Sequence, residues 1–78
     1  MARLLEVCVD DPLGLAEAQA GGADRVELCA ALALGGLTPT AGLMAAVAGI
    51  KAHAMIRPRS GDFCYAAAEV AEIGRAHV

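Results

Sequence analysis

Carboxylates and thiols recur at matching places in two short apolar stretches of this chain. Glu6 and Cys8 lie in LLEVCV, and Glu27 and Cys29 lie in DRVELC, with the glutamate two residues before the cysteine each time. Because side chains alternate across a strand, each pair shares one face of its strand. Neighbouring strands lie about 4.8 Å apart, so the sulfurs of Cys8 and Cys29 could share one Cu(I), the soft ion that thiolates favour.

Other features of the sequence bear on a metal site. His53 and Met55, on the equivalent face of AHAMI, are weaker candidate ligands. The three cysteines are an odd number, which favours free thiols over a disulfide framework. No CxxC or HxxxH spacing supports ligation, and a free cysteine is often only a small buried hydrophobic residue. Both interpretations stay open.

The glutamates could also act in acid–base chemistry. A carboxylate inside a fold is costly unless it is paired or hydrogen-bonded, and candidate cations are available in Arg25, Arg57 and Arg59. One interpretation makes Glu6 or Glu27 a general acid or base and the arginines a clamp for a substrate carboxylate or phosphate. The other is a structural network of ion pairs.

The stretch RPRSGDFCY is unusually polar for this chain. Pro58 keeps the residue before it extended, so Arg57 and Arg59 should project together toward one end of the preceding strand. Asp62 is a candidate for substrate binding and, more readily, for the N-cap of the following helix. Cys64 is expected in the core or just behind a pocket wall. The two aromatic residues would either line that wall or pack on the next unit: Phe63 and Tyr65.

Six elements would position these side chains. We expect strands at Leu4–Val9, Asp24–Cys29 and Ala52–Ile56. A first helix should follow the cap Asp11 over Pro12–Ala20, and a third should lie within AAAEVAEI. A second helix should begin at Thr38 and Pro39 and carry an apolar stripe of Leu43, Val47 and Ile50. The alternation of strands and helices predicts an α/β fold with parallel strands and right-handed crossovers. Lys51 and Glu69 to Glu72 read as ordinary solvated positions.

Composition limits the partners. The chain has 78 residues, enough for one small domain, with 58% hydrophobic residues and a formal net charge of −3. This charge gives no reason to expect nucleic acid or an anionic membrane as a partner. No apolar run approaches the roughly 20 residues of a membrane span. We therefore expect a cytoplasmic protein that binds a metal ion or a small anionic molecule.

One face of the three expected strands is polar, and it grows more polar toward their C-terminal ends. Parallel strands covered by helices on both sides are apolar on both faces, whereas the mouth of a (β/α)8 barrel supplies a polar inner face. Three βα units are only about a third of the roughly 250 residues of such a barrel. The prediction is therefore a partial TIM barrel, with Gly35 and Gly36 letting the second loop fold over the mouth.

In their order and spacing, LLEVC, GGADRVELCAA, GGLTPT and MIRPRSGDFCY make the chain resemble the N-terminal part of the CutC copper homeostasis family. The resemblance extends from Leu4 to about Ile73. It implies a TIM barrel in residues 1–72, a cytoplasmic location and a role in handling copper. On this basis Cu(I) is the expected cargo.

The last six residues depart from that resemblance. IGRAHV, from Ile73 to Val78, resembles the translation of a sequencing adapter, so we expect residues 73–78 to be a non-native tail. Genomic sequence that continues beyond Glu72 would test this.

Three functions follow from these patterns. The first is Cu(I) binding and handling by a CutC-like barrel. The second is an uncharacterised barrel enzyme acting on a small phosphate- or carboxylate-bearing metabolite, which is consistent with active sites lying at the C-terminal ends of barrel strands. The third is a fragment with no activity of its own. Homo-oligomerisation of the full-length protein stays an open alternative.

Overall fold

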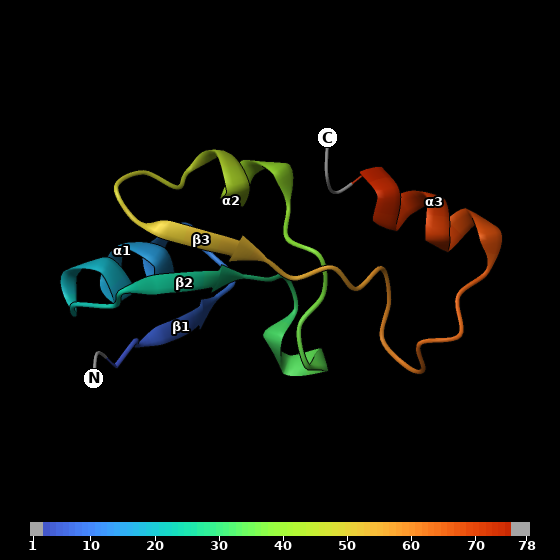
Figure 1. Cartoon of the computed structure of the whole chain (residues 1–78), viewed down its shortest axis with the longest axis horizontal. Coiled ribbons are helices and arrows are strands. Elements are labelled where there is room, and N and C mark those ends of the chain that lie inside the picture. Colours follow the sequence, from blue (N-terminus) through green and yellow to red (C-terminus); the bar gives the residue numbers. More distant parts are fainter. Residues whose placement is uncertain (1–2, 76–78) are drawn as a thin grey trace.

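The structure, a computed structural model, describes residues 3–75. Strands and helices alternate along the chain (Figure 1). In order they are β1 (Glu6–Val9), α1 (Pro12–Ala20), β2 (Arg25–Leu28), the short 3-10 helix η1 (Leu32–Leu34), α2 (Ala41–Ala45), β3 (Lys51–Ala54) and α3 (Ala67–Arg75). This is the predicted α/β order.

The three strands form one parallel sheet in the order β1-β2-β3. The central strand β2 is paired on both sides, with Val26 opposite Val7 of β1 and Ala52 of β3. Each strand therefore follows its predecessor in space as it does in sequence, which is the arrangement of successive βα units. The predicted parallel sheet is confirmed.

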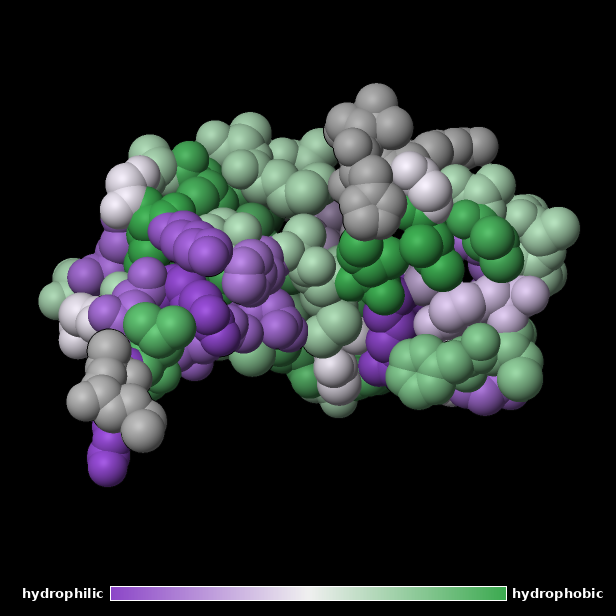
Figure 2. All heavy atoms as spheres, in the orientation of Figure 1, coloured by the Kyte–Doolittle hydropathy of each residue, from purple (hydrophilic) through white to green (hydrophobic). Residues whose placement is uncertain are grey.

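The two faces of the sheet differ in chemistry. Side chains from alternate positions of the strands pack with those of the helices into one core, formed by Val9, Leu15, Val26, Leu28 and Leu43. The other face carries the polar side chains, and Figure 2 shows hydrophilic residues gathered over the sheet. Alternation of side chains along each strand separates the two sets.

Helix α1 begins and ends where the sequence predicts. Asp11 is its N-cap and accepts a hydrogen bond from the backbone N–H of Gly14 at 2.6 Å, while Pro12 occupies the first turn. The helix then ends before Gly21. Its buried residue is Leu15, which anchors the helix to the sheet.

Helix α2 differs from the prediction. It is capped by Thr40, whose Oγ1 accepts from the N–H of Leu43 at 3.1 Å, and not by Thr38. The hydroxyl of Thr38 instead accepts a hydrogen bond from the N–H of Arg57 at 2.9 Å. This tertiary contact uses the oxygen that would otherwise cap the helix. The expected stripe is split as well, because the helix ends at Ala45.

Val47 and Ile50 therefore lie in the connection after α2, yet both still pack against the core. The hydrophobic pattern correctly identified positions that pack against the core but overestimated the length of the helix. Strand β3 is likewise shorter than predicted, ending at Ala54. The N–H of Met55 still donates to the carbonyl of Leu28 at 2.8 Å, which continues the strand's direction one residue further.

Helix α3 lies apart from the sheet, beyond the long loop that follows β3 (Figure 1). The predicted non-native tail overlaps the end of this helix, and residues 76–78 lie outside the described residues. The origin of the tail stays a prediction. Among the described helices, none has the length and apolar character that crossing a bilayer requires.

Two leucines of α1 provide a matched test of the core. Leu15 is 4% exposed and Leu13 is 67% exposed. We expect Leu15→Ala to lower the free energy of unfolding by about 2–5 kcal/mol, because it removes buried methyl groups and leaves a cavity. Leu13→Ala should change it by less than about 0.5 kcal/mol. Urea denaturation followed by circular dichroism measures both, and equal effects would contradict this packing.

Candidate functional site

The register between β1 and β2 determines which polar side chains meet. Cys8 lies opposite Glu27, and Glu6 lies opposite Arg25. If the two copies of the sequence repeat were aligned across the strands, Cys8 would lie opposite Cys29. The observed pairing differs from that alignment by two residues. A stagger between adjacent strands is what barrel geometry requires.

This offset brings three potential ligands together. The sulfurs of Cys8 and Cys29 and a carboxylate oxygen of Glu27 all lie within 4.8 Å of one another. Cys8 is exposed, Glu27 is half-buried and Cys29 is buried. The predicted proximity of the two cysteines is therefore present. Glu27 lies beside them as an additional donor, a residue for which the sequence left acid–base chemistry and an ion pair open.

Cys29 is the most enclosed member of this cluster. Its side chain is 1% exposed, and its Sγ lies 3.8 Å from Glu27 Oε1 and 3.7 Å from the Glu27 carbonyl. Burial, and after it the negative charges of Glu27 and Cys8, raises the pKa of the Cys29 thiol to about 11. Without a cation nearby, Cys29 is thus held as a neutral thiol at neutral pH. All three cysteines of the chain are free.

Glu6 belongs to a separate group of charges. It forms an ion pair with Nε of Arg25, and Nδ1 of His53 lies 3.9 Å from the same carboxylate oxygen. Of the three cations that the sequence offered as partners for the glutamates, Arg25 is the one that pairs with Glu6. The ion-pair interpretation of Glu6 gains support from this geometry, and His53 lies beside a carboxylate rather than beside the sulfurs.

Met55 borders the cluster from the loop side. Gly36 is buried, and a side-chain carbon at that position would lie 3.4 Å from Cε of Met55 and 3.7 Å from Sγ of Cys29. Both side chains therefore border the same small space. Gly36 has φ of 93°, a conformation that glycine adopts without strain, so the loop can approach the sulfur closely.

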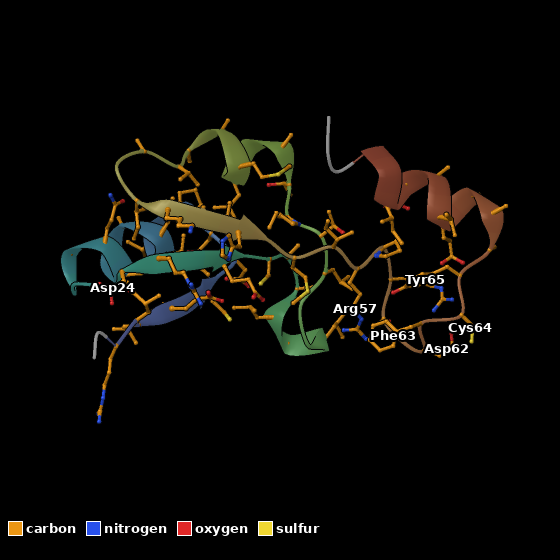
Figure 3. All side chains as sticks on the ribbon, in the orientation of Figure 1. Asp24, Arg57, Asp62, Phe63, Cys64 and Tyr65 are labelled. Carbon is orange, nitrogen blue, oxygen red and sulfur yellow. The ribbon has the colours of Figure 1, made fainter. Side chains whose placement is uncertain are left out.

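Arg57 is directed to the loop after β2. Its Nη1 donates to the carbonyls of Leu34 at 3.0 Å and Gly36 at 3.2 Å, and its guanidinium lies over the ring of Phe63 at 5.5 Å (Figure 3). These contacts join the loop after β2 to the loop after β3. Nη1 and Nη2 of the guanidinium are therefore engaged by carbonyls of the same chain, whereas its buried Nε has no hydrogen-bond partner among the described residues.

Arg59 does the same for the start of α3. It pairs with Glu69 and with Asp62, and it donates to the carbonyl of Cys64 at 2.8 Å. The N–H of Ala66, and after it Arg59, holds the pKa of the Glu69 carboxyl below its ordinary value. Sequence reasoning missed Glu69, which it treated as a solvated position; no local pattern marks a partner ten residues away along the chain.

Asp62 is not the cap of α3. Its Oδ1 accepts the N–H of Cys64 at 3.1 Å, which closes a turn well before the helix begins at Ala67. Glu69 instead accepts the N–H of Ala66 at 2.9 Å and so satisfies a donor at the helix start. The prediction of a cap was wrong because the polar stretch forms a longer loop than the sequence suggested.

Among the remaining residues of the loop, Phe63 and Cys64 are exposed and Tyr65 is half-buried. Cys64 is exposed, so of the two places predicted for it the core was wrong. Phe63 and Tyr65 contact each other edge to face with ring centroids 6.3 Å apart, and Tyr65 also lies beneath the guanidinium of Arg59 at 5.1 Å (Figure 3). The two aromatic rings therefore stabilise the arginines of their own loop.

Taken together, the sheet and its inner face define a class of protein. Consecutive parallel βα units with polar side chains on the face opposite the helices are the beginning of a (β/α) barrel. The chemistry on that face is a cluster of two sulfurs and one carboxylate, which is a set of metal-binding donors.

Comparison with known proteins places the chain in a family. Residues 3–76 match the CutC family, and the chain belongs to it. A CutC family protein of Caulobacter vibrioides is 70% identical over 69 residues, covering 86% of this chain, and one of Rhizobium meliloti is 62% identical over 73 residues, covering 90%.

A solved structure supports the same assignment. The crystal structure of a CutC protein from Streptococcus agalactiae, whose name links it to copper homeostasis, matches with a TM-score of 0.81 and 32% sequence identity over 95% of this chain. The predicted fold, a partial TIM barrel, is thereby confirmed. This chain covers 39% of that structure, and it spans 28% of the Caulobacter relative and 30% of the Rhizobium relative.

The two cysteines of the cluster should differ in reactivity. The thiolate is the nucleophile, and a pKa of about 11 in place of 9.0 lowers the thiolate fraction of Cys29 about 100-fold. We expect iodoacetamide at neutral pH to label Cys8 and Cys64 first and to leave Cys29 unmodified in the folded, metal-free protein. Peptide mass spectrometry measures this, and the urea-unfolded chain is the control. Labelling of all three at one rate would contradict the burial of Cys29.

The same thiol should make stability fall in alkali. The unfolded thiol loses its proton near pH 9.0 and the folded one near pH 11, so between these values the unfolded state binds fewer protons. The contribution of the Cys29 thiol to the free energy of unfolding is complete below pH 9.0. It falls by about 2–3 kcal/mol as the pH rises through 11.

Cys29→Ala is the control for this loss, because it lacks the titrating group. The difference in free energy of unfolding between the wild type and this variant, measured in urea at several pH values, isolates the thiol from other groups that titrate. A difference that stays constant across the window would show that Cys29 titrates normally.

Proposed function

We propose that this chain carries the Cu(I)-binding part of a copper-handling CutC barrel, with Cys8 and Cys29 as the ligands. The observation that carries the proposal is the convergence of both sulfurs on the inner face of the sheet, within 4.8 Å of each other and of Glu27. Thiolates are the protein ligands that Cu(I) prefers. The copper homeostasis name of the Streptococcus agalactiae relative supports the choice of metal.

The difference in burial suggests how an ion would enter. Cys8 is exposed and can meet an incoming ion first, whereas Cys29 is buried and would complete the coordination from the interior. Binding would displace the proton of Cys29, because the thiolate is the ligand and the positive ion offsets the charges that raise its pKa. The bound ion is cargo in this proposal.

Met55 is the further soft donor that Cu(I) could recruit. It is half-buried, and it borders the same space as the sulfur of Cys29 beside Gly36. A thioether is a suitable additional ligand for Cu(I). His53 is less well placed, because it lies beside the Glu6 carboxylate. Free thiols and a reduced copper ion are both consistent with a cytoplasmic location, which is part of the proposal.

The contacts of Arg57 and Arg59 give less support to an enzyme that clamps an anionic metabolite. The guanidinium of Arg57 donates to carbonyls of the loop after β2, and that of Arg59 pairs with Asp62 and Glu69. An incoming phosphate or carboxylate would have to compete with these bonds. Copper handling is therefore the function that the described geometry supports best.

Replacing both proposed ligands tests the proposal. Cys8→Ser together with Cys29→Ser should weaken Cu(I) binding by more than the roughly 10–100-fold that loss of a group hydrogen-bonded to a ligand costs. The measurement is an anaerobic competition titration of the purified chain against a chromophoric Cu(I) chelator. Cys64→Ser is the matched control, because this exposed cysteine lies outside the cluster and its loss should leave the affinity unchanged. Equal affinity of the double variant and the wild type would refute the proposal.

A further inference from the structure

We propose that the cluster is also a site for a divalent thiophilic cation, Zn²⁺ foremost, in which Glu27 is the third ligand beside Cys8 and Cys29. The inference deepens the proposed function, since it rests on the same cluster binding a metal ion. It differs in the ion and in the ligand set.

Glu27 lacks the cation that comparable carboxylates have. Glu6 pairs with Arg25, and Glu69 pairs with Arg59. Glu27 is half-buried like them, yet among the side chains that the structure describes no Lys, Arg or His forms an ion pair with it. The thiol of Cys29, 3.8 Å from Oε1 of Glu27, is a weak donor and carries no positive charge. A carboxylate withdrawn from water without a cation is costly, and a bound metal ion would supply that charge.

The charge of the cluster favours two positive charges over one. Two thiolates and one carboxylate carry three negative charges, of which Cu(I) offsets one and Zn²⁺ offsets two. The residual charge matters here because Cys29 is buried, and charge repulsion is weakly screened away from water. A divalent ion therefore relieves more of the repulsion between these groups.

The donor atoms and their spacing suit Zn²⁺. Zinc accepts thiolate sulfur and carboxylate oxygen together, at about 2.3 Å and 2.0–2.2 Å respectively, whereas Cu(I) prefers sulfur alone. In a tetrahedral site these bonds place the donors roughly 3.5 Å apart, so side-chain rotation from the present spacing of up to 4.8 Å brings them into range. Three protein ligands leave one position open to water on the exposed side of Cys8.

Met55 and Glu27 should then confer opposite preferences on one pair of sulfurs. Glu27 offers an oxygen donor that Zn²⁺ uses and Cu(I) does not need, and Met55 offers a thioether that Cu(I) can use and Zn²⁺ does not. Each can be replaced by a residue of similar shape without touching the cysteines. Glu27→Gln removes the charge, and Met55→Leu removes the sulfur while conserving volume.

The experiment titrates wild type and both variants with Zn²⁺ and, anaerobically, with Cu(I), each against a chromophoric competitor. We expect Glu27→Gln to lower Zn²⁺ affinity at least about tenfold, the smallest cost seen when an outer partner of a metal ligand is removed, and to leave Cu(I) affinity unchanged. Met55→Leu should leave Zn²⁺ affinity unchanged. Glu27→Asp keeps the carboxylate on a side chain that is shorter by one methylene, and it should retain part of the Zn²⁺ affinity. It replaces Glu27→Gln in the comparison if that variant does not fold.

The outcomes separate this inference from the proposed function. Wild type that binds Cu(I) but not Zn²⁺, or a Glu27→Gln variant with unchanged Zn²⁺ affinity, overturns the inference and leaves copper binding intact. Zn²⁺ binding that requires Glu27, without tight Cu(I) binding, supports the inference and overturns the copper proposal. Binding of neither ion overturns both. Circular dichroism of each variant confirms that any loss is not a loss of fold.

Discussion

The parallel hydrogen-bonded register of β1 against β2 is the constraint on which the rest of the structure depends. It places Cys8 opposite Glu27 and Glu6 opposite Arg25. A shift of one residue would turn the apolar side chains of β1 away from the helices and its polar side chains into the core. The buried pairs of the core therefore hold the register, and the register in turn holds the metal-binding donors together.

The cluster and the core lie on opposite faces of one sheet, and these faces differ in how far they exclude water. The core face excludes water and is continuous from β1 through β3, with Val26 fully buried at its centre. On the inner face, Cys8 is accessible and Cys29 is enclosed. Cys8 lies within an edge strand, whereas Cys29 follows the central strand and is covered by the loop that contains Gly36. A mixed pair of one open and one enclosed thiol is the result.

Much of this architecture was predictable from local patterns. The cap and proline of α1, the alternation within the strands and the βα order each depend on neighbouring residues, and they were predicted correctly. Two errors occurred where a distant partner competes for a side chain: Thr38 bonds Arg57 instead of capping α2, and Glu69 pairs with Arg59. Asp62 instead accepts a local bond from Cys64, which closes a turn where a helix cap was predicted.

The sequence by itself determined which residues share a face of each strand, because alternation is a property of the extended backbone. It also determined the family, through motifs that are contiguous in the chain. Only the tertiary structure decided that Glu27, and not His53, joins the two sulfurs. The physical reason is that the stagger between strands is set by packing of the whole sheet against its helices, and no single strand contains that information.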